Sequence, residues 1–295
     1  MNKTMSIIFA FLLLINISCS KAQDKLKPII NSKTMNEQPI YTLKVTSSNP
    51  YESYINNMVL EKDYLTGSSD SELIINDLIL KSGKQKLQIV LLPNDGNKTV
   101  DKLGIDYLTL SIYRYNNGYS SYVERKSTLI YEFKLDDPHV EMPLITKEWI
   151  FNIDVPYKLK NWEHSIDLRK EDEDKLLKEV VDYYNHLANI INKGDKKSFL
   201  TIMKVRNSEV FKSFYNDAEL IKEDERYIDN KLSKSIGNIQ PLENYNIMFY
   251  GNGRIVTLED KKGETPLFAE DKNDIYSYQI YLHRPYPNAP LEVIR

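Results

Sequence analysis

The chain has 295 residues, of which 39 are Lys or Arg and 42 are Asp or Glu, giving a formal net charge of −3. A charge so close to neutral, without a basic patch or an aromatic RNA-binding motif, argues against a nucleic-acid partner. The only cysteine, Cys19, cannot form an intrachain bridge, so a disulfide-stabilised fold is excluded. With 41% hydrophobic residues, the chain can bury one or two cores without such cross-links.

The N-terminus has the pattern of a secretory signal: Lys3, an apolar run over residues 7–15, and small or polar residues before Cys19. The run of about ten residues is shorter than the roughly 20 that span a bilayer. It resembles a bacterial lipoprotein signal, in which a small residue, here Ser18, precedes a cysteine that is lipidated and becomes the mature N-terminus. Asn16 departs from the lipoprotein pattern, which usually has an aliphatic residue at that position.

The resemblance implies that residues 1–18 are a signal peptide and that acyl chains such as palmitate on Cys19 hold the protein on a membrane of the bacterial envelope. Each buried methylene of such a chain contributes about 0.8 kcal/mol. Ser20 after the cysteine favours the outer membrane over the inner one. The polar residues 19–38 predict a flexible tether. The alternative is an ordinary signal cleaved after Ala22, which would discard the cysteine.

Residues 39–160 consist of short segments that alternate apolar and polar side chains and are separated by Gly, Pro, Asn and Asp. This pattern predicts an antiparallel β-sandwich domain, with a barrel as the alternative. Residues 94–106 carry several oxygen-bearing side chains, but their spacing does not match a calcium-binding loop. We interpret that stretch as a solvated turn.

Residues 161–174 form a polar stretch, after which the spacing of apolar residues changes from two to three or four. The apolar residues within 176–191 recur at three- and four-residue steps, which predicts a helix with one buried face, and Gly194 predicts its end. Further helices are expected over residues 196–205 and within 208–234. The acidic residues 171–174 are interpreted as the first turn of a helix rather than as a catalytic carboxylate pair.

After Gly237 the period returns to two, and the sequence of residues 251–253, Gly-Asn-Gly, predicts a tight hairpin turn. Residues 161–295 therefore predict an α+β domain in which a helical segment packs on a C-terminal antiparallel sheet. This order, with YYNHLANIINKGDKKSFL where a long first helix ends in a Gly-Asp turn, resembles the cone-shaped folds of the nuclear transport factor 2 class over residues 170–284. Such folds host both enzymes and binding modules, so the resemblance implies no single function.

The motifs of common active sites are absent from the sequence: it has no G-x-S-x-G elbow, no phosphate-binding loop and no dinucleotide fingerprint. The four histidines show no H-x-x-x-H spacing that would indicate a metal pair. Thiol catalysis is excluded because the only cysteine is the lipidation residue. We therefore expect no catalytic residue, no cofactor and no metal ion, and a chain that is not an enzyme.

Tyrosine is unusually frequent, with 21 copies, and it offers stiff, amphipathic contact area of the kind that protein and sugar surfaces use. Four tyrosines surround an Asn-Asn-Gly turn, and a histidine and an arginine lie together near the end of a C-terminal strand. The candidate binding surface comprises Tyr113, Tyr115, Tyr119, Tyr122, His283 and Arg284. The alternative is a structural role, in which the tyrosines pack across neighbouring strands and His283 and Arg284 hold the C-terminal segment in place.

An anchored, extracytoplasmic chain without a catalytic motif predicts a non-enzymatic module that binds a protein partner. Immunity lipoproteins, which neutralise toxins delivered into the envelope, are one class of this kind. The alternative is an envelope enzyme, or a glycan- or small-molecule-binding protein, that uses a pocket in the C-terminal α+β domain. A concave site in that domain with converging titratable groups would favour the alternative.

Overall fold

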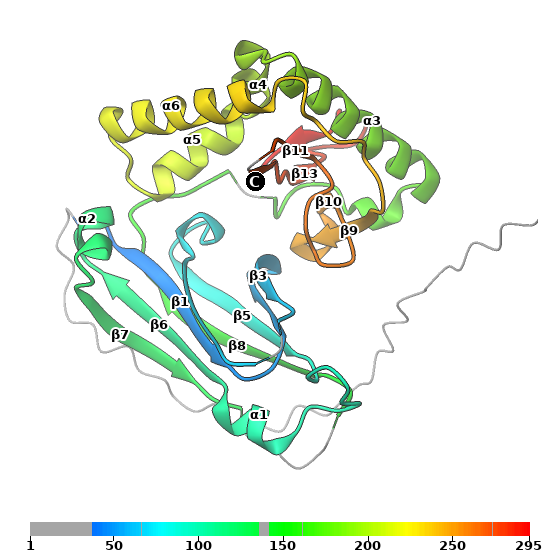
Figure 1. The fold of residues 1–295 in the computed structure, drawn as a ribbon. Coiled ribbons are helices and arrows are strands. Elements are labelled where there is room, and N and C mark those ends of the chain that lie inside the picture. The colour runs from blue at the N-terminus through cyan, green and yellow to red at the C-terminus, as the bar shows by residue number, and fades with distance from the viewer. Residues whose placement is uncertain (1–36, 66, 136–141, 161, 273) are drawn as a thin grey trace, which may run out of the picture.

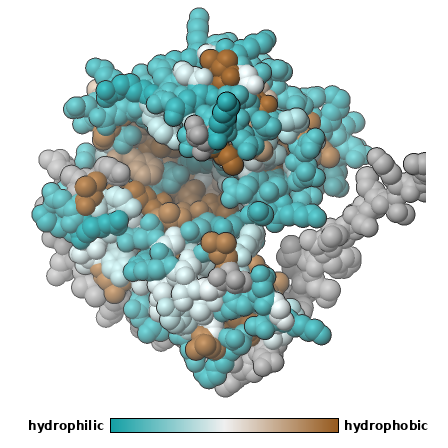
Figure 2. Space-filling view, viewed as in Figure 1, coloured by the Kyte–Doolittle hydropathy of each residue, from teal (hydrophilic) through white to brown (hydrophobic). Residues whose placement is uncertain are grey.

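The computed structural model describes residues 37–65, 67–135, 142–160, 162–272 and 274–295, with the side chains of 119–121 excepted. The predicted signal peptide, Cys19 and the tether up to residue 36 lie outside the described residues. The described chain forms two halves, an all-β half and a half of helices and strands, which pack against each other (Figure 1). Figure 2 shows that the molecule is hollowed between the halves, with a mostly apolar floor and a hydrophilic rim.

The first half is an antiparallel β-sandwich, as the alternating segments predicted. One sheet has the strand order β4-β1-β6-β7 and the other β3-β2-β5-β8. The strands are β1 (Ile40–Ser47), β2 (Tyr51–Ile55), β3 (Met58–Asp63), β4 (Ser69–Ile74), β5 (Gly83–Leu91), β6 (Thr109–Tyr115), β7 (Ser127–Phe133) and β8 (Ile145–Ile153). Burial alternates along β2 and β5, because successive side chains of a strand point to opposite faces.

Short helices interrupt the sandwich at places where none was expected. They are η1 (Asn76–Leu78), α1 (Lys102–Tyr107) and α2 (Gly118–Val123). Asp101 begins α1 by accepting a hydrogen bond from the backbone N–H of Gly104 at 2.7 Å. The stretch predicted to be a solvated turn therefore includes a capped helical turn, and Asp101 acts as its N-cap.

The second half has helices on an antiparallel sheet, which confirms the mixed fold class. The helices are η2 (Leu168–Lys170), α3 (Glu173–Asn192), α4 (Lys196–Ile202), α5 (Lys204–Ser213), α6 (Ala218–Ser235) and η3 (Gly251–Gly253). The strands are β9 (Asn246–Tyr250), β10 (Ile255–Glu259), β11 (Phe268–Glu270), β12 (Ile275–Ser277), β13 (Leu282–His283) and β14 (Glu292–Val293). Strands β14-β13-β10-β9 form one sheet, β11 pairs with β12, and the predicted hairpin joins β9 to β10.

Helix α3 buries the apolar stripe that the sequence predicted, including Leu176, Val180 and Leu187. Tyr184, at the centre of the stripe, is fully buried, and its hydroxyl bonds to Thr257 Oγ1 at 2.9 Å and accepts from the Leu258 N–H at 3.1 Å. The helix is thereby fixed to β10 by polar contacts as well as by packing. No helix in the described part of the chain is long and apolar enough to cross a membrane.

The hydrophobic core of the sandwich extends into the second half, which also has a core of its own. The cluster that fills the sandwich also contains Tyr250, Ile255 and Ile294 from the second half. A buried ion pair, between Arg295 Nη1 and Glu209 Oε2 at 2.6 Å, lies at the same junction, where Arg295 Nε also donates to the Asp77 carbonyl at 3.1 Å. The architecture changes after β8, but the packing is continuous across that change.

Candidate functional site

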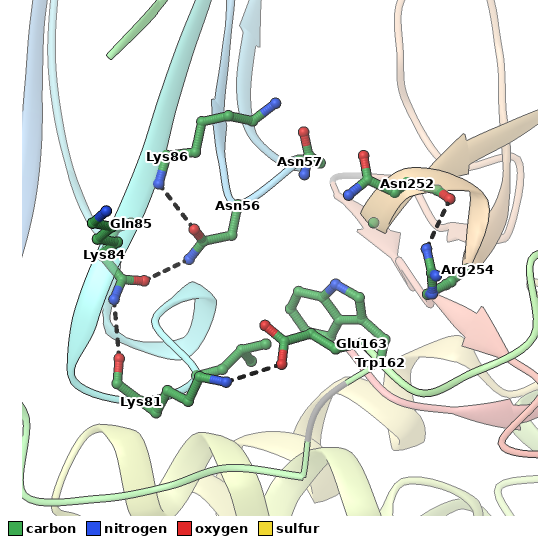
Figure 3. Close-up of a pocket in the computed structure, with 12 residues that line it drawn as sticks. Asn56, Asn57, Lys81, Lys84, Gln85, Lys86, Trp162, Glu163, Asn252 and Arg254 are labelled. Carbon is green, nitrogen blue, oxygen red and sulfur yellow. Dashed lines mark hydrogen bonds and ion pairs between the residues drawn. The ribbon is translucent and has the colours of Figure 1, made fainter. Parts of the chain in front are cut away.

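The junction between the halves contains a cleft of about 470 Å3, shown in Figure 3. Four segments form its walls: the β2–β3 turn, residues 80–86 before and within β5, the linker residues Trp162 and Glu163, and the β9–β10 turn over residues 251–254. The side chains of Asn57 and Asn252 approach each other from the two halves in Figure 3. The cleft is therefore assembled only when both halves are in place.

The β2–β3 turn is held rigidly by Asn56. Asn56 and Asn57 both have positive φ, 53° and 64°, as a two-residue hairpin turn requires, and asparagine tolerates this conformation well. The Asn56 side chain donates to the Leu78 carbonyl and to Gln85 Oε1, both at 2.8 Å. It also accepts from the Lys86 N–H at 3.0 Å. Asn56 therefore braces the wall, which leaves the Asn57 side chain facing the cleft.

The opposite wall is the β9–β10 turn, which packs directly on Trp162. Gly251 has φ of 56°, and a Cβ atom there would lie 2.7 Å from the Trp162 ring, so only glycine fits. The Gly251 N–H donates to the Asn57 carbonyl at 2.9 Å, which ties the two hairpins together. The Asn252 carbonyl accepts from Arg169 Nη2 at 2.9 Å and from Arg254 Nη1 at 3.3 Å.

The charges that line the cleft are mainly positive. Lys81 is paired with Glu163 at 3.1 Å, and Lys86 is paired with Glu148, which is not itself a lining residue, at 2.8 Å. Within the described residues, no carboxylate lies within salt-bridge distance of the other two cations, Lys84 and Arg254. The buried Nε of Arg254 also has no hydrogen-bond partner there. These donors can hold carboxylate, sulfate or phosphate oxygens.

A neighbouring hollow of about 360 Å3 extends this basic surface. It shares Lys81 with the cleft and adds Lys158, Lys160 and His164. Lys160 is paired with Glu292 at 2.7 Å, and both side chains are partly exposed. The cationic surface thus continues from the cleft along the linker between the halves.

Trp162 forms the floor of the cleft and is not a free stacking platform. It is only 3% exposed, and the Arg295 guanidinium lies 5.1 Å from its ring centroid. This arrangement is a cation–π contact within the junction. A ligand in the cleft would meet the edge of the indole and the surrounding amide and cationic groups.

The tyrosines proposed as a binding surface lie elsewhere, on β6 and α2. Tyr115 is 2% exposed, and its hydroxyl donates to Glu72 at 2.6 Å. Its ring meets that of Tyr122 edge-on at 5.3 Å, and Tyr113 is half-buried in β6. The side chain of Tyr119 lies outside the described residues. Tyr113, Tyr115 and Tyr122 are not among the described residues that line the cleft.

His283 and Arg284 are internal. His283 has no exposed area, lies at the bottom of the neighbouring hollow, and bonds to Ser165 Oγ at 2.7 Å and Glu292 Oε1 at 3.0 Å. Burial lowers the pKa of His283, although Glu292 acts in the opposite direction. The guanidinium of Arg284 bonds to Glu171 at 2.8 Å and to Glu179 at 2.7 Å. These contacts fix the C-terminal strands to the start of α3.

Nothing in the sequence pattern singled out the cleft. Lys81, Lys84 and Lys86 flank Gly83 in an ordinary turn-to-strand segment, and Arg254 follows the Gly-Asn-Gly turn. The hairpin turn was predicted, but its meeting with the Asn56–Asn57 turn was not. The signal that could have been noticed is the density of lysines from position 81 to 86.

Comparisons with known proteins give no relative. No protein-family model matches the chain, and searches of curated proteins and of solved structures find no match either. Among the described residues, no group of three or more His, Cys, Asp or Glu side chains is placed to hold a metal ion.

Proposed function

We propose that the chain is a lipid-anchored, extracytoplasmic module that binds a protein partner by taking acidic side chains of that partner into the cleft. One observation carries this proposal. Lys81, Lys84 and Lys86 from the first half and Arg254 from the second line a polar cleft in which Glu163 is the single carboxylate among the described lining residues. Cations spread around a cleft of this size suit several acidic groups of a protein surface better than one small anion.

Binding rather than catalysis is proposed because of the chemistry of the lining. A hydrolytic or group-transfer site needs a nucleophile or a general base directed at the substrate. The described lining residues of the cleft include no serine, cysteine, histidine or aspartate, and Glu163 is already paired with Lys81. A toxin-neutralising immunity protein is one module of this kind, and its acidic partner would then be a toxin.

The binding proposal is tested with an oligoglutamate peptide as the probe. The purified protein should bind this peptide with an affinity that falls as the salt concentration rises, because the contacts are between partly exposed charges. A peptide of equal length in which glutamine replaces glutamate is the control and should bind at least tenfold more weakly. Equal binding of the two peptides would contradict the proposal.

The anchor is the second part of the proposal, and it rests on the sequence because Cys19 lies outside the described residues. The apolar run, Ser18 and the absence of any other cysteine support lipidation at Cys19, with the outer membrane as the favoured location. Lipidation accounts for membrane attachment without a spanning helix, since two or more acyl chains hold a protein stably.

Replacing Cys19 with serine is expected to abolish incorporation of a fatty-acid analogue and to release the protein from the membrane fraction. Metabolic labelling followed by fractionation measures both effects in cells. Ser20→Ala, which leaves the cysteine in place, is the matched control and should keep the label. An unchanged label in the Cys19→Ser variant would show that the signal is cleaved elsewhere, for example after Ala22, and would refute the anchor.

A further inference from the structure

A separate cavity of about 290 Å3 lies within the second half, away from the cleft. Helices α5 and α6, the segment 277–280 and two residues near the end of α4 form its walls. Its volume lies just below the range of about 300–1,000 Å3 found for small-molecule sites. The cavity therefore has the size for a small metabolite rather than for a polymer.

One side of the cavity is apolar. Phe199, Met203, Ile228 and Ile280 contribute to its lining, and Phe199 meets the ring of Tyr278 edge-on with 6.0 Å between centroids. Phe199, Met203 and Ile280 are buried in the core of this half. This wall is therefore preformed and suits an aliphatic or aromatic group.

Three charged side chains line the same cavity. Asp224 and Lys231 are seven residues apart on α6, so they share a helix face with Ile228, and Arg206 approaches from α5. In the described part of the chain, no carboxylate oxygen lies within 4 Å of a side-chain nitrogen of Arg206 or Lys231. No described residue donates a hydrogen bond to the Asp224 carboxylate.

Arg206 and Lys231 also have N–H donors that make no hydrogen bond within the described structure. Arg206 uses Nη1 to donate to Asn207 Oδ1 at 2.9 Å, which leaves most of its five N–H groups. Lys231 Nζ donates to the Ser277 carbonyl at 2.5 Å and lies 4.2 Å from the centroid of the Tyr278 ring, which leaves further N–H donors. Both cations can therefore donate hydrogen bonds to an added anionic oxygen without losing an existing contact.

The charged groups of the cavity are partly buried, and no salt bridge joins them to one another or to a neighbouring described residue. Burial raises the pKa of Asp224 and lowers the pKa values of Arg206 and Lys231. The charge of Arg206 opposes the shift of Asp224 and adds to that of Lys231, and the charges of Asp77 and Asp224 oppose the shift of Arg206. Such shifts mean that the surroundings disfavour the charged forms. A ligand that supplied the opposite charge to each group would relieve that cost.

We propose that this cavity binds a small zwitterion, namely a free α-amino acid with an apolar side chain. The ligand carboxylate accepts hydrogen bonds from Arg206 and Lys231, its ammonium donates to Asp224, and its side chain lies against Phe199, Met203 and Ile228. This inference is independent of the proposed protein-binding cleft, because the two sites share no lining residue.

Isothermal titration calorimetry with L-leucine as the probe tests the proposal on the purified protein. Leucine should bind, whereas N-acetyl-L-leucine, which lacks the ammonium, and L-leucinamide, which lacks the carboxylate, should each bind at least tenfold more weakly. The isosteric variant Asp224→Asn should also weaken leucine binding at least tenfold. Glu223→Gln, a change at an exposed position on the same helix, should leave it unchanged.

Three results would overturn the proposal. One is no binding of leucine, methionine or phenylalanine at millimolar concentration. Another is N-acetyl-leucine or leucinamide binding as tightly as leucine, because the site would then not require both charges. The third is an equal affinity for leucine in the Asp224→Asn variant and the unmodified protein. None of these results bears on the oligoglutamate experiment, so failure of one proposal can be told from failure of the other.

Discussion

Replacing Lys62 with methionine is expected to lower the free energy of unfolding by about 3–5 kcal/mol, because the Glu259 carboxylate would remain buried without its cation. Lys62 lies in β3 and Glu259 in β10, so this ion pair joins the two halves. Lys62 Nζ and Glu259 Oε2 are 2.5 Å apart, and the two side chains are only 9% and 2% exposed. The Tyr250 hydroxyl lies 2.9 and 3.0 Å from the two carboxylate oxygens and holds the acid in place.

Urea unfolding followed by circular dichroism measures the effect of Lys62→Met. The matched control is Lys44→Met, also on a strand, whose ion pair with Asp70 is 3.2 Å long and has side chains that are 36% and 60% exposed. An exposed pair of this kind contributes about 0–1 kcal/mol, so the control should unfold almost as the unmodified protein does. Equal losses in the two variants would contradict the assignment of the Lys62–Glu259 pair as a buried link between the halves.

Replacing both Lys84 and Arg254 with glutamine is expected to weaken oligoglutamate binding about 30-fold or more, which corresponds to about 2 kcal/mol. Neither cation is neutralised by a carboxylate within salt-bridge distance in the described structure, so both are available to a partner. The Arg254 guanidinium is the more buried of the two, and loss of a half-buried donor mainly increases the dissociation rate.

The control for this double variant replaces two lysines outside the cleft, Lys98 and Lys272, with glutamine. It therefore produces the same change in net charge. Both are exposed, and neither lines the cleft. Fluorescence anisotropy of a labelled peptide compares the variants at one salt concentration. If the control weakens binding as much as the cleft variant does, the peptide responds to overall charge, and the cleft has no particular role.

The fold class could be predicted because the spacing of apolar residues and the positions of Gly, Pro, Asn and Asp agree with the strands, helices and turns of the structure over long stretches. The errors are local. The helix expected within residues 208–234 is two helices, α5 and α6, since Tyr215 has a left-handed φ of 58° and Asp217 caps α6. Asp217 is a visible cap, but a tyrosine with positive φ has no sequence signature. The short helix α1 was missed because a single capped turn has no apolar period of its own.

The candidate site was less predictable, because it depends on how distant segments meet. Asn57 and Gly251 are each readable as turn residues, yet the hydrogen bond from the Gly251 N–H to the Asn57 carbonyl forms only when the two halves pack together. Arg284 likewise pairs with a residue that lies far from it in the sequence. The sequence assigned Glu171 to the first turn of a helix, whereas the structure places it just before the Asp172 cap of α3 and pairs it with this distant arginine.

The decisive measurement for the cleft is amide hydrogen exchange with and without the oligoglutamate peptide. If acidic groups dock between the halves, exchange should slow in residues 80–86 and 251–254 together, although these segments are far apart in the chain. Slowing confined to the tyrosine-bearing residues 113–122, or no slowing at saturating peptide, would contradict docking in the cleft.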